Sequence, residues 1–436
     1  MILFDLSRLI SRAGRETPTG IDRVELAYAE HFMGAGGIDP GGSLSFTMLT
    51  ASGRFGLLPR EVAGDYVRTM AAAWRGQCSL PRAIQRTKQL GRSARFHALW
   101  TGEKALRAQS RASAGLPAYL LVSHHHLEKR RAIARLLRQT RARFVCMIHD
   151  LIPIEYPEYA LPGQDGKHRR RIETAAEFAD AVIVNSSVTR DAFRPYLAQA
   201  GRDPPVLVAP FGSELPDSVP DGRPPSARPY FVCIGTIEAR KNHLLLLNVW
   251  RQLAAELGEA TPALALIGQR GWEAESAMDM LERCPALRGL VREYRNLPDT
   301  EVARLMRGAR ALLLPSFAEG FGFPVIEALA QGIPVICSNL AALRENGGDV
   351  PEYLDPLDGL GWRAAILDYT RLDSARRGAQ LRRLGGWKPP RWDDHFARVQ
   401  ALISETRMVD RRSAESPRRS ARGTAQVDAH RMADIR

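Results

Sequence analysis

The sequence has few cysteines and no long apolar run. Its five cysteines, Cys78, Cys146, Cys233, Cys284 and Cys337, are an odd number without Cys-x-x-Cys spacing, which favours a reducing compartment over a disulfide framework. No apolar run approaches the ~18 residues that a membrane-spanning helix needs. The first residues have no basic stretch before a long apolar segment, so they do not predict a secretory signal peptide. Together these absences predict a cytoplasmic protein.

Signals for metal and nucleic-acid binding are also missing. The sequence has no zinc-ligand spacing, no RNA-binding signature and no clear helix-turn-helix, so we expect no nucleic-acid partner. It has no Asp-x-Asp motif, which gives no support to a metal-bridged donor. Three consecutive histidines, His124 to His126, are expected on a strand, where successive side chains point to opposite faces and cannot easily share one ion. We therefore predict neither a metal site nor a cofactor.

The charge that is present is strongly positive. The net charge is +13, and residues 61–111 hold ten Lys and Arg against three acidic residues. Apolar residues interleave with these cations, namely Ile84, Leu90, Phe96, Leu99, Trp100 and Leu106. An ordinary solvated face would explain the pattern. A surface for an anionic membrane would also explain it, and would attach the protein peripherally to the inner face of the cell membrane.

The chain is long enough for two domains. At 436 residues it exceeds one usual hydrophobic core. Residues 1–213 alternate short apolar runs with helical segments, and residues 230–386 repeat that α/β pattern after a proline-rich linker at 214–229. A helix within 387–405 follows. The last segment, 406–436, is rich in Arg, Ser and Ala, and we predict that it is disordered.

The most informative stretch is 315–327, where Glu319 and Glu327 lie eight positions apart around a Gly-Phe-Gly turn. The apolar run 311–314 before it predicts a buried parallel strand, and the run 325–331 predicts a helix. This order places backbone N–H groups and a helix N-terminus at the C-terminal edge of a sheet, where α/β proteins bind ligands. Two carboxylates there suit the hydroxyls of a polyol. A capped helix with two solvated glutamates is the alternative.

A second motif runs from Phe231 to His243. An apolar strand ends at Gly235, and a short loop then brings adjacent Arg240 and Lys241 to the start of a helix over 244–255. Two cations at the end of a strand suit a diphosphate, because charge-assisted bonds to phosphate are strong. They would also stabilise a departing nucleoside diphosphate. A solvated basic loop is the alternative.

The two motifs together resemble the signature of the retaining GT-B glycosyltransferases of family GT4, which includes bacterial mannosyltransferases. The resemblance implies an α/β fold of two Rossmann-like domains facing across a cleft, with a C-terminal helix that crosses back to the first domain. It implies that Glu319, Phe321, Gly322 and Phe323 face the donor sugar and that Glu327 holds the ribose. Many members carry an Arg directly after the first glycine of the phosphate loop.

This chain has Thr236 at that position, so Arg240 and Lys241 would carry more of the diphosphate charge. His149, after the strand 144–148, resembles the active-site histidine of the family, although a core histidine is the alternative. Gly20 resembles the glycine whose N–H approaches the diphosphate. Gly268 ends a strand that starts at Ala263. In the family, this region surrounds the nucleotide base. Trp272 could stack on the base there, or it could be an ordinary packing residue. These matches make His149, Glu319, Arg240 and Lys241 the candidate catalytic residues.

The resemblance implies a retaining transfer of a hexose, with mannose favoured, from a nucleotide diphosphate sugar, with GDP-mannose first. The acceptor would be a glycan or lipid-linked molecule in the synthesis of a surface polysaccharide such as lipopolysaccharide. Two alternatives stay open. A GT-B nucleotide-sugar epimerase would convert its substrate without an acceptor, and a non-catalytic glycan- or membrane-binding module would fail to bind any sugar nucleotide.

Overall fold

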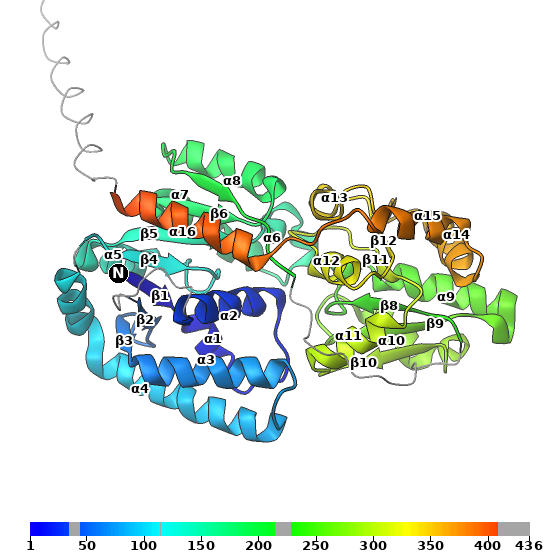
Figure 1. The fold of residues 1–436 in the computed structure, drawn as a ribbon, viewed down its shortest axis with the longest axis horizontal. Coiled ribbons are helices and arrows are strands. Elements are labelled where there is room, and N and C mark those ends of the chain that lie inside the picture. The colour runs from blue at the N-terminus through cyan, green and yellow to red at the C-terminus, as the bar shows by residue number, and fades with distance from the viewer. Residues whose placement is uncertain (35–43, 114, 214–227, 409–436) are drawn as a thin grey trace, which may run out of the picture.

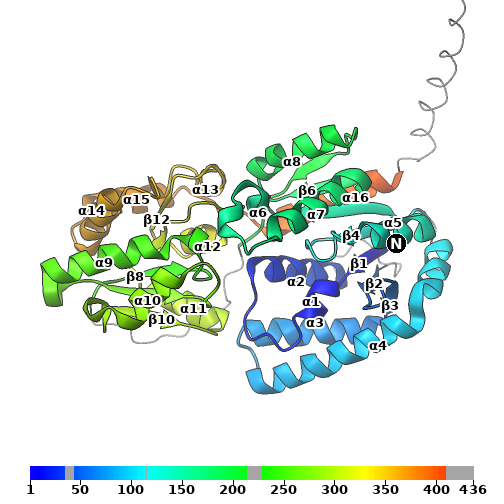
Figure 2. The same ribbon diagram turned by 180° about the vertical axis from the view of Figure 1, so that it is seen from behind.

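The computed structural model describes residues 1–34, 44–113, 115–213 and 228–408. Two α/β lobes lie side by side, each with a sheet between layers of helices (Figures 1 and 2). Most of the predicted linker, and the predicted tail beyond Met408, lie outside the described residues. Within the described ranges, no helix is both long and apolar enough to span a membrane.

The first lobe is built on a seven-stranded sheet in the order β3-β2-β1-β4-β5-β6-β7. Its strands are β1 (Ile2–Asp5), β2 (Leu44–Leu49), β3 (Phe55–Leu58), β4 (Ala118–Leu121), β5 (Arg143–Ile148), β6 (Ala181–Val184) and β7 (Val206–Val208). All neighbouring pairs are parallel except β2 with β3. The central strands are buried along their whole length, which explains why they are continuous apolar runs in the sequence.

Helices cover both faces of this sheet. They are α1 (Ser7–Ser11), α2 (Gly20–Met33), α3 (Arg60–Trp74), α4 (Leu80–Ala112), α5 (Arg130–Thr140), α6 (Ile152–Glu155), α7 (Gln164–Phe178) and α8 (Ser187–Gln199), with a 3-10 turn at Pro157–Tyr159. The basic stretch 61–111 therefore folds mainly into two long helices, α3 and α4, at the outer side of the lobe (Figure 1).

The second lobe holds a parallel six-stranded sheet in the order β10-β9-β8-β11-β12-β13. Its strands are β8 (Tyr230–Ile234), β9 (Ala263–Ile267), β10 (Val291–Tyr294), β11 (Leu312–Leu314), β12 (Val335–Ser338) and β13 (Glu352–Leu354). Its helices are α9 (His243–Leu257), α10 (Glu275–Arg283), α11 (Asp299–Arg307), α12 (Phe323–Ala330), α13 (Ala341–Gly347), α14 (Gly359–Thr370) and α15 (Ala375–Leu384), with 3-10 turns at Ala239–Lys241, Gly258–Ala260 and Pro285–Leu287.

The last described helix, α16 (Trp392–Met408), returns to the first lobe and lies across it in Figure 1. Its apolar side chains Phe396, Val399 and Ile403 are buried in the core of that lobe. His395 is buried with them, and its Nε2 lies 2.7 Å from the hydroxyl of Tyr28 on α2. The helix continues to residue 408, three residues beyond position 405, where the sequence predicts it to end.

Candidate active site

The topology brings the two sequence motifs together. In the second sheet the strand order reverses at β8, which pairs with β9 on one side and β11 on the other. Loops that leave neighbouring strands on opposite faces open a crevice at such a switch point. The loop after β8 holds Arg240 and Lys241, and the loop after β11 holds Glu319. Residues 78 positions apart are therefore direct neighbours.

A compact ionic cluster forms where these loops meet. Lys241 Nζ donates to Glu319 Oε1 at 2.5 Å, and Arg240 Nη1 donates to Glu319 Oε2 at 3.1 Å. Arg240 Nη2 also donates to Glu238 Oε1 at 2.7 Å, and Ser316 Oγ donates to Glu319 Oε1 at 2.6 Å. The Glu319 side chain is only 7% exposed, whereas those of Lys241 and Arg240 are 11% and 19% exposed. The carboxylate is thus buried beneath two cations that still reach the surface.

Glu319 is ionised over the whole physiological range. Burial opposes its charge, but Lys241 and Arg240 outweigh that cost and lower the pKa of the carboxyl to about 2. Burial opposes the charge of Arg240 as well, but the carboxylates of Glu319 and Glu238 together outweigh it and raise the pKa of Arg240 above its ordinary value. Glu319 and Arg240 therefore both stay charged near neutral pH, which suits an electrostatic site better than a proton-transfer site. Sequence reasoning did not assign Glu238 or Ser316 to it.

The Gly-Phe-Gly turn is fixed by its glycines. Gly322, the N-cap residue of α12, has φ +89°, and a Cβ there would lie 2.3 Å from Leu343 Cδ2. Both the left-handed backbone and the lack of space therefore require glycine. Gly320 packs against the first lobe, because its Cβ would lie 2.8 Å from the carbonyl oxygen of His149. Glu327 is half-buried on α12, about one helical turn beyond its first residue.

Aromatic side chains join the turn to the first lobe. The ring of Phe211, which follows β7, stacks on Phe323 at 5.3 Å and lies 4.8 Å from Phe321. Phe321 is buried and packs with the core of the first lobe. The side chains of Phe321 and Phe323 are therefore engaged in this contact between the lobes.

His149 lies on the other side of the same contact. Its Nε2 is 2.8 Å from the carbonyl oxygen of Val122, which can only accept, so Nε2 carries the proton. Its carbonyl oxygen accepts a bond from Asn185 Nδ2 at 2.9 Å. Burial lowers the pKa of His149 to about 4, which leaves the ring neutral near pH 7. The structure thus places His149 beside Gly320 as a neutral, backbone-anchored ring.

The three consecutive histidines do not lie on a strand, contrary to the expectation from the sequence. β4 ends at Leu121, and the three form a turn in which His126 has φ +51°. His124 Nε2 accepts a bond from the N–H of His149 at 3.1 Å, and its ring packs on His168. His126 faces Asp5 instead, at 3.5 Å. The strand ends before the three histidines, although apolar residues lie on both sides of them in the sequence.

Gly20 faces the second lobe. It is the first residue of α2, and its Cβ would lie 3.5 Å from the ring of Phe323. Thr19 and Asp22 cap this helix end reciprocally, and the Asp22 carboxylate also accepts bonds from Arg8 at 2.7 Å and Arg12 at 3.1 Å. Burial opposes the charge of Asp22, but the two guanidinium groups prevail and lower its pKa. The Gly20 loop is thus held by an ionic clamp that sequence reasoning missed.

A buried acid lies directly behind this clamp. Glu25 is fully buried on α2, and its Oε1 accepts a bond from the N–H of Leu9 at 3.2 Å. Burial, reinforced by the charges of Asp5 and Asp22 and only partly offset by Arg8, raises the pKa of Glu25 to about 8.

The raised pKa of Glu25 predicts a pH-dependent stability. The folded state keeps a proton that the unfolded chain releases above its ordinary pKa of 4.5. The Glu25 contribution to the free energy of unfolding should therefore fall as pH rises from about 4.5 to about 8, so the free energy of wild type minus that of Glu25→Gln should fall over this range. Urea unfolding of both proteins across that range measures it, with the exposed Glu61→Gln as control. Parallel pH profiles for wild type and Glu25→Gln would show that Glu25 is charged in the folded protein.

Gly268 and Trp272 follow β9. A Cβ on Gly268 would lie 2.0 Å from the carbonyl oxygen of Gly235, so glycine is needed there for close packing of two loops. Trp272 is 40% exposed, and its Nε1 donates to the carbonyl oxygen of Tyr159 in the first lobe at 3.1 Å. Its ring therefore bridges the lobes. Further bridges are Arg23 with Asp299 at 2.5 Å and Ser187 with Glu345 at 2.7 Å.

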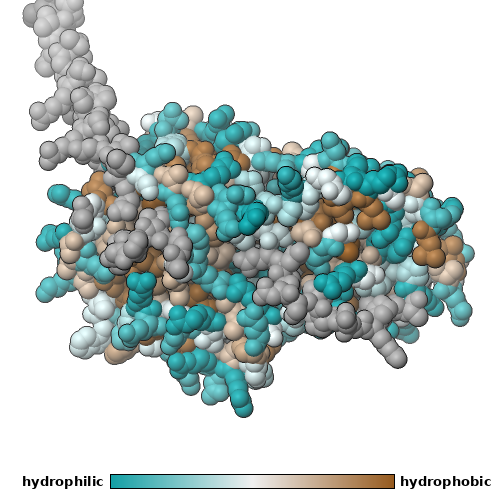
Figure 3. Space-filling view, in the orientation of Figure 1, coloured by the Kyte–Doolittle hydropathy of each residue, from teal (hydrophilic) through white to brown (hydrophobic). Residues whose placement is uncertain are grey.

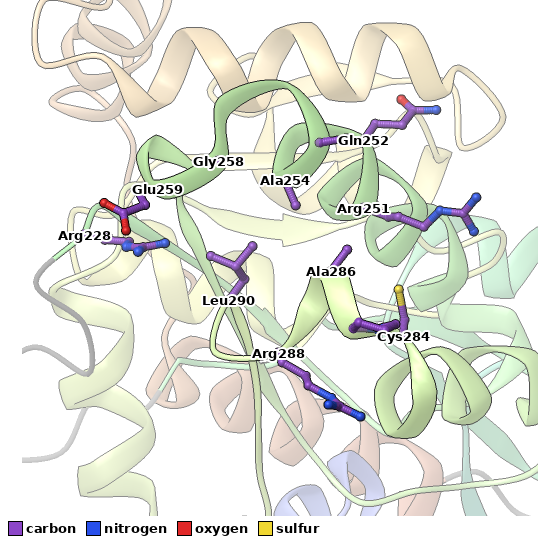
Figure 4. A pocket seen from close by; sticks show the side chains of 12 residues that line it. Arg228, Arg251, Gln252, Ala254, Gly258, Glu259, Cys284, Ala286, Arg288 and Leu290 are labelled. Atoms are coloured by element: carbon purple, nitrogen blue, oxygen red, sulfur yellow. The ribbon is translucent and has the colours of Figure 1, made fainter.

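A cavity of about 930 Å³ lies elsewhere on the second lobe (Figure 4). Arg228, Arg251, Glu259 and Arg288 contribute to its lining, and none of the predicted site residues does. The segments 258–260 and 285–290 that border it precede β9 and β10, so it lies at the amino ends of these strands. The ionic cluster lies at the carboxyl ends, where α/β sheets bind their ligands.

Comparison with known proteins decides the family. A sequence model described as family 4 glycosyltransferase in conflict systems matches residues 98–345, which is more than half of the chain and includes both motifs. The chain belongs to glycosyltransferase family 4. This confirms the resemblance that its motifs carry, and it favours a glycosyltransferase over an epimerase or a non-catalytic binding module.

Relatives of this glycosyltransferase agree with that placement. O-antigen chain mannosyltransferase B of Escherichia coli is 31% identical over 259 residues, which cover 58% of this chain and 68% of that protein. The serotype-specific mannosyltransferase WbdA of Escherichia coli is 29% identical over 219 residues, which cover 46% of this chain and 27% of WbdA. The chain thus spans about a quarter of WbdA.

Solved structures confirm the GT-B fold. A UDP-forming α,α-trehalose-phosphate synthase from Burkholderia xenovorans superposes with a TM-score of 0.54 at 11% identity, covering 85% of this glycosyltransferase and 90% of the synthase. A sucrose-phosphate synthase from Thermosynechococcus elongatus superposes with a TM-score of 0.51 at 19% identity, covering 70% and 76% of the two chains. At these low sequence identities, the superpositions show a shared fold and nothing about shared activity.

Proposed function

We propose that this enzyme is a retaining mannosyltransferase that uses GDP-mannose and extends a glycan or lipid-linked acceptor during synthesis of a surface polysaccharide. The observation that carries the proposal is the buried Glu319 beneath Lys241 and Arg240 at the switch point of the second sheet. The names of the two Escherichia coli relatives support mannose and O-antigen assembly as the sugar and the process.

The diphosphate of the donor would bind at the cations. Lys241 and Arg240 lie in the loop after the carboxyl end of β8, and their side chains are 11% and 19% exposed, which would leave phosphate oxygens a way to reach them. Glu319 and Glu238 together balance the charges of the two cations in the structure. A diphosphate that approaches would take over bonds from Lys241 and Arg240, and would leave Glu319 able to accept from sugar hydroxyls. The two cations then stabilise the charge that develops on the leaving nucleoside diphosphate.

The sugar would lie between the two lobes. On the side of the second lobe, it would be bordered by Glu319 and the backbone N–H groups of the Gly-Phe-Gly turn. On the side of the first lobe, it would be bordered by His149 and Gly20. Because His149 is neutral and anchored through Nε2, we assign it a positioning role and no proton transfer. Glu327 on α12 is assigned to the ribose hydroxyls.

Retention would follow from front-face attack through an oxocarbenium-like state. Glu319 is engaged by Lys241, Arg240 and Ser316, so it is a poor covalent nucleophile, and no other residue is proposed for that role. The departing phosphate would accept the proton of the attacking hydroxyl on the same face of the sugar. A lipid-linked acceptor would bring the enzyme to the inner face of the membrane.

The donor and the stereochemistry are tested by one set of assays. Thermal-shift measurements with GDP-, UDP- and dTDP-sugars should show the largest stabilisation with GDP-mannose. NMR of the product should then show the anomeric configuration of the donor retained. An inverted product would refute the mechanism, and a preference for UDP- or dTDP-sugars would refute the donor.

Turnover should persist in EDTA. In this proposal Lys241 and Arg240 offset the diphosphate charge, the task that a divalent cation performs in a metal-dependent transferase. Initial rates measured with EDTA and with added Mg²⁺ should therefore agree within about twofold. Loss of activity in EDTA that Mg²⁺ restores would contradict our assignment of the diphosphate site to these two side chains.

A further inference from the structure

One helix of the first lobe exposes large apolar side chains to solvent. On α4, Phe96 is 59% exposed, Leu99 57% and Trp100 81%. These positions have the i, i+3, i+4 spacing that places them on one face of a helix. We call them the α4 ridge. The helix bends directly after it, at Gly102, whose φ is +53°.

The packing of α4 fixes this face outward. The opposite side of the helix buries Ala94 and Ala98 against the lobe. The approach is close, because a Cβ on Gly56 of β3 would lie 1.9 Å from the carbonyl oxygen of Ala98. Rotation of the helix to hide the ridge would push larger side chains into this contact. The apolar exposure is therefore built into the lobe.

The part of α4 that carries the ridge is itself positively charged. Residues 80–101 contain five Lys and Arg and no acidic residue. Lys88, Arg92, Phe96 and Trp100 follow one another at four-residue intervals, and all four are exposed, so two cations lead along the helix to the ridge. Glu103 follows the bend and lies 3.7 Å from Arg135 on α5.

Charge decides what can cover the ridge. A second copy of α4 would bring like charges together. The chain beyond Met408 holds seven arginines against four acidic residues, so it too carries a charge of the same sign. The surface of a bilayer rich in anionic lipid offers both negative headgroups for Lys88 and Arg92 and an apolar interior for the ridge.

We infer that the α4 ridge is a membrane-docking surface, on which Phe96, Leu99 and Trp100 insert into the headgroup region of an anionic bilayer while Lys88 and Arg92 bind lipid phosphates. Tryptophan suits this depth, because its ring is apolar and its N–H can still bond to headgroups or water. The inference is independent of the donor and acceptor, since no residue of the proposed active site lies on α4.

Flotation with lipid vesicles tests the inference. The full chain should bind vesicles of phosphatidylglycerol and phosphatidylethanolamine, and should bind phosphatidylcholine vesicles at least about tenfold more weakly. Added salt should weaken the binding, because the attraction is screened within about 8 Å at physiological ionic strength. Trp100→Glu should lower the vesicle affinity by about tenfold or more, and Lys88→Gln with Arg92→Gln by about 10- to 30-fold.

A matched control is available on the second lobe. Leu360 is 77% exposed, but the acidic Asp355 and Asp358 are near it in sequence, so Leu360→Glu should leave vesicle binding unchanged. Turnover on a soluble acceptor should be unchanged in all of these variants. Absent binding, or equal binding by wild type and Trp100→Glu, would overturn the inference. So would a wild-type dimer in light scattering that Trp100→Glu converts to a monomer, because the ridge would then join two copies of the chain.

Discussion

Replacing Lys241 with alanine is expected to lower turnover by about 10²-fold or more, because the variant loses one of two cations that offset the charge on the leaving diphosphate. The effect should be large here because Thr236 stands where many family members have a third cation. Lys241→Arg should recover part of the rate, since it keeps the charge but changes its geometry. Initial rates with saturating donor measure the effect.

Stability must be followed in the same experiment. Lys241 is buried against Glu319, and removal of one partner from a buried ion pair can destabilise a protein by about 3–5 kcal/mol. Thermal unfolding of each variant therefore accompanies the kinetics, with Lys129→Ala as the control at an exposed lysine. A folded Lys241→Ala enzyme with near wild-type turnover would remove Lys241 from the mechanism.

Replacing Glu319 with glutamine should lower turnover by roughly 10²-fold while nucleoside diphosphate affinity stays equal or rises. Turnover falls because hydrogen bonds to a charged acceptor contribute about 1.5–3 kcal/mol, and contacts to the sugar tighten in the transition state. Affinity for GDP is preserved because Glu319 binds Lys241 and Arg240 in the free enzyme and so competes with the diphosphate. Calorimetric titration with GDP and steady-state kinetics separate the two effects.

Glu327→Ala provides the comparison. If Glu327 holds the ribose, this variant should bind GDP about 10- to 10²-fold more weakly, since it loses bonds to a charged acceptor. Glu405→Gln, at an exposed position on α16, serves as the neutral control. Equal changes of GDP affinity in the Glu319 and Glu327 variants would show that the two carboxylates do not divide their work in this way.

Much of the site could be predicted from local sequence because its parts are local. Position 322 requires glycine, because its backbone is left-handed and Leu343 leaves no room for a Cβ. The sequence shows this requirement directly, as a glycine just before a helix. Arg240 and Lys241 adjoin a buried strand that ends in glycine, so their place at a sheet edge follows from the strand itself. The family and the GT-B fold predicted from these motifs are confirmed.

Pairings between distant segments could not be predicted in this way. The ionic bonds of Glu319 to Lys241 and Arg240 exist because β8 and β11 are neighbours in the sheet, and that order is a property of the whole lobe. The clamp of Arg8 on Asp22 likewise depends on how α1 packs beside α2. The three histidines after β4 were predicted to lie on a strand, because apolar residues lie on both sides of them in the sequence.

The basic stretch 61–111 shows most clearly what the local sequence determines and what only the tertiary structure decides. The sequence by itself determined that apolar residues alternate with cations from 61 to 111, which fits either a solvated face or a membrane surface. Tertiary structure decided which apolar residues are free, since Leu90 and Leu106 are buried while Phe96, Leu99 and Trp100 are exposed. The reason is physical: the close approach of β3 at Gly56 sets the rotation of α4, and that contact joins segments that no local pattern connects.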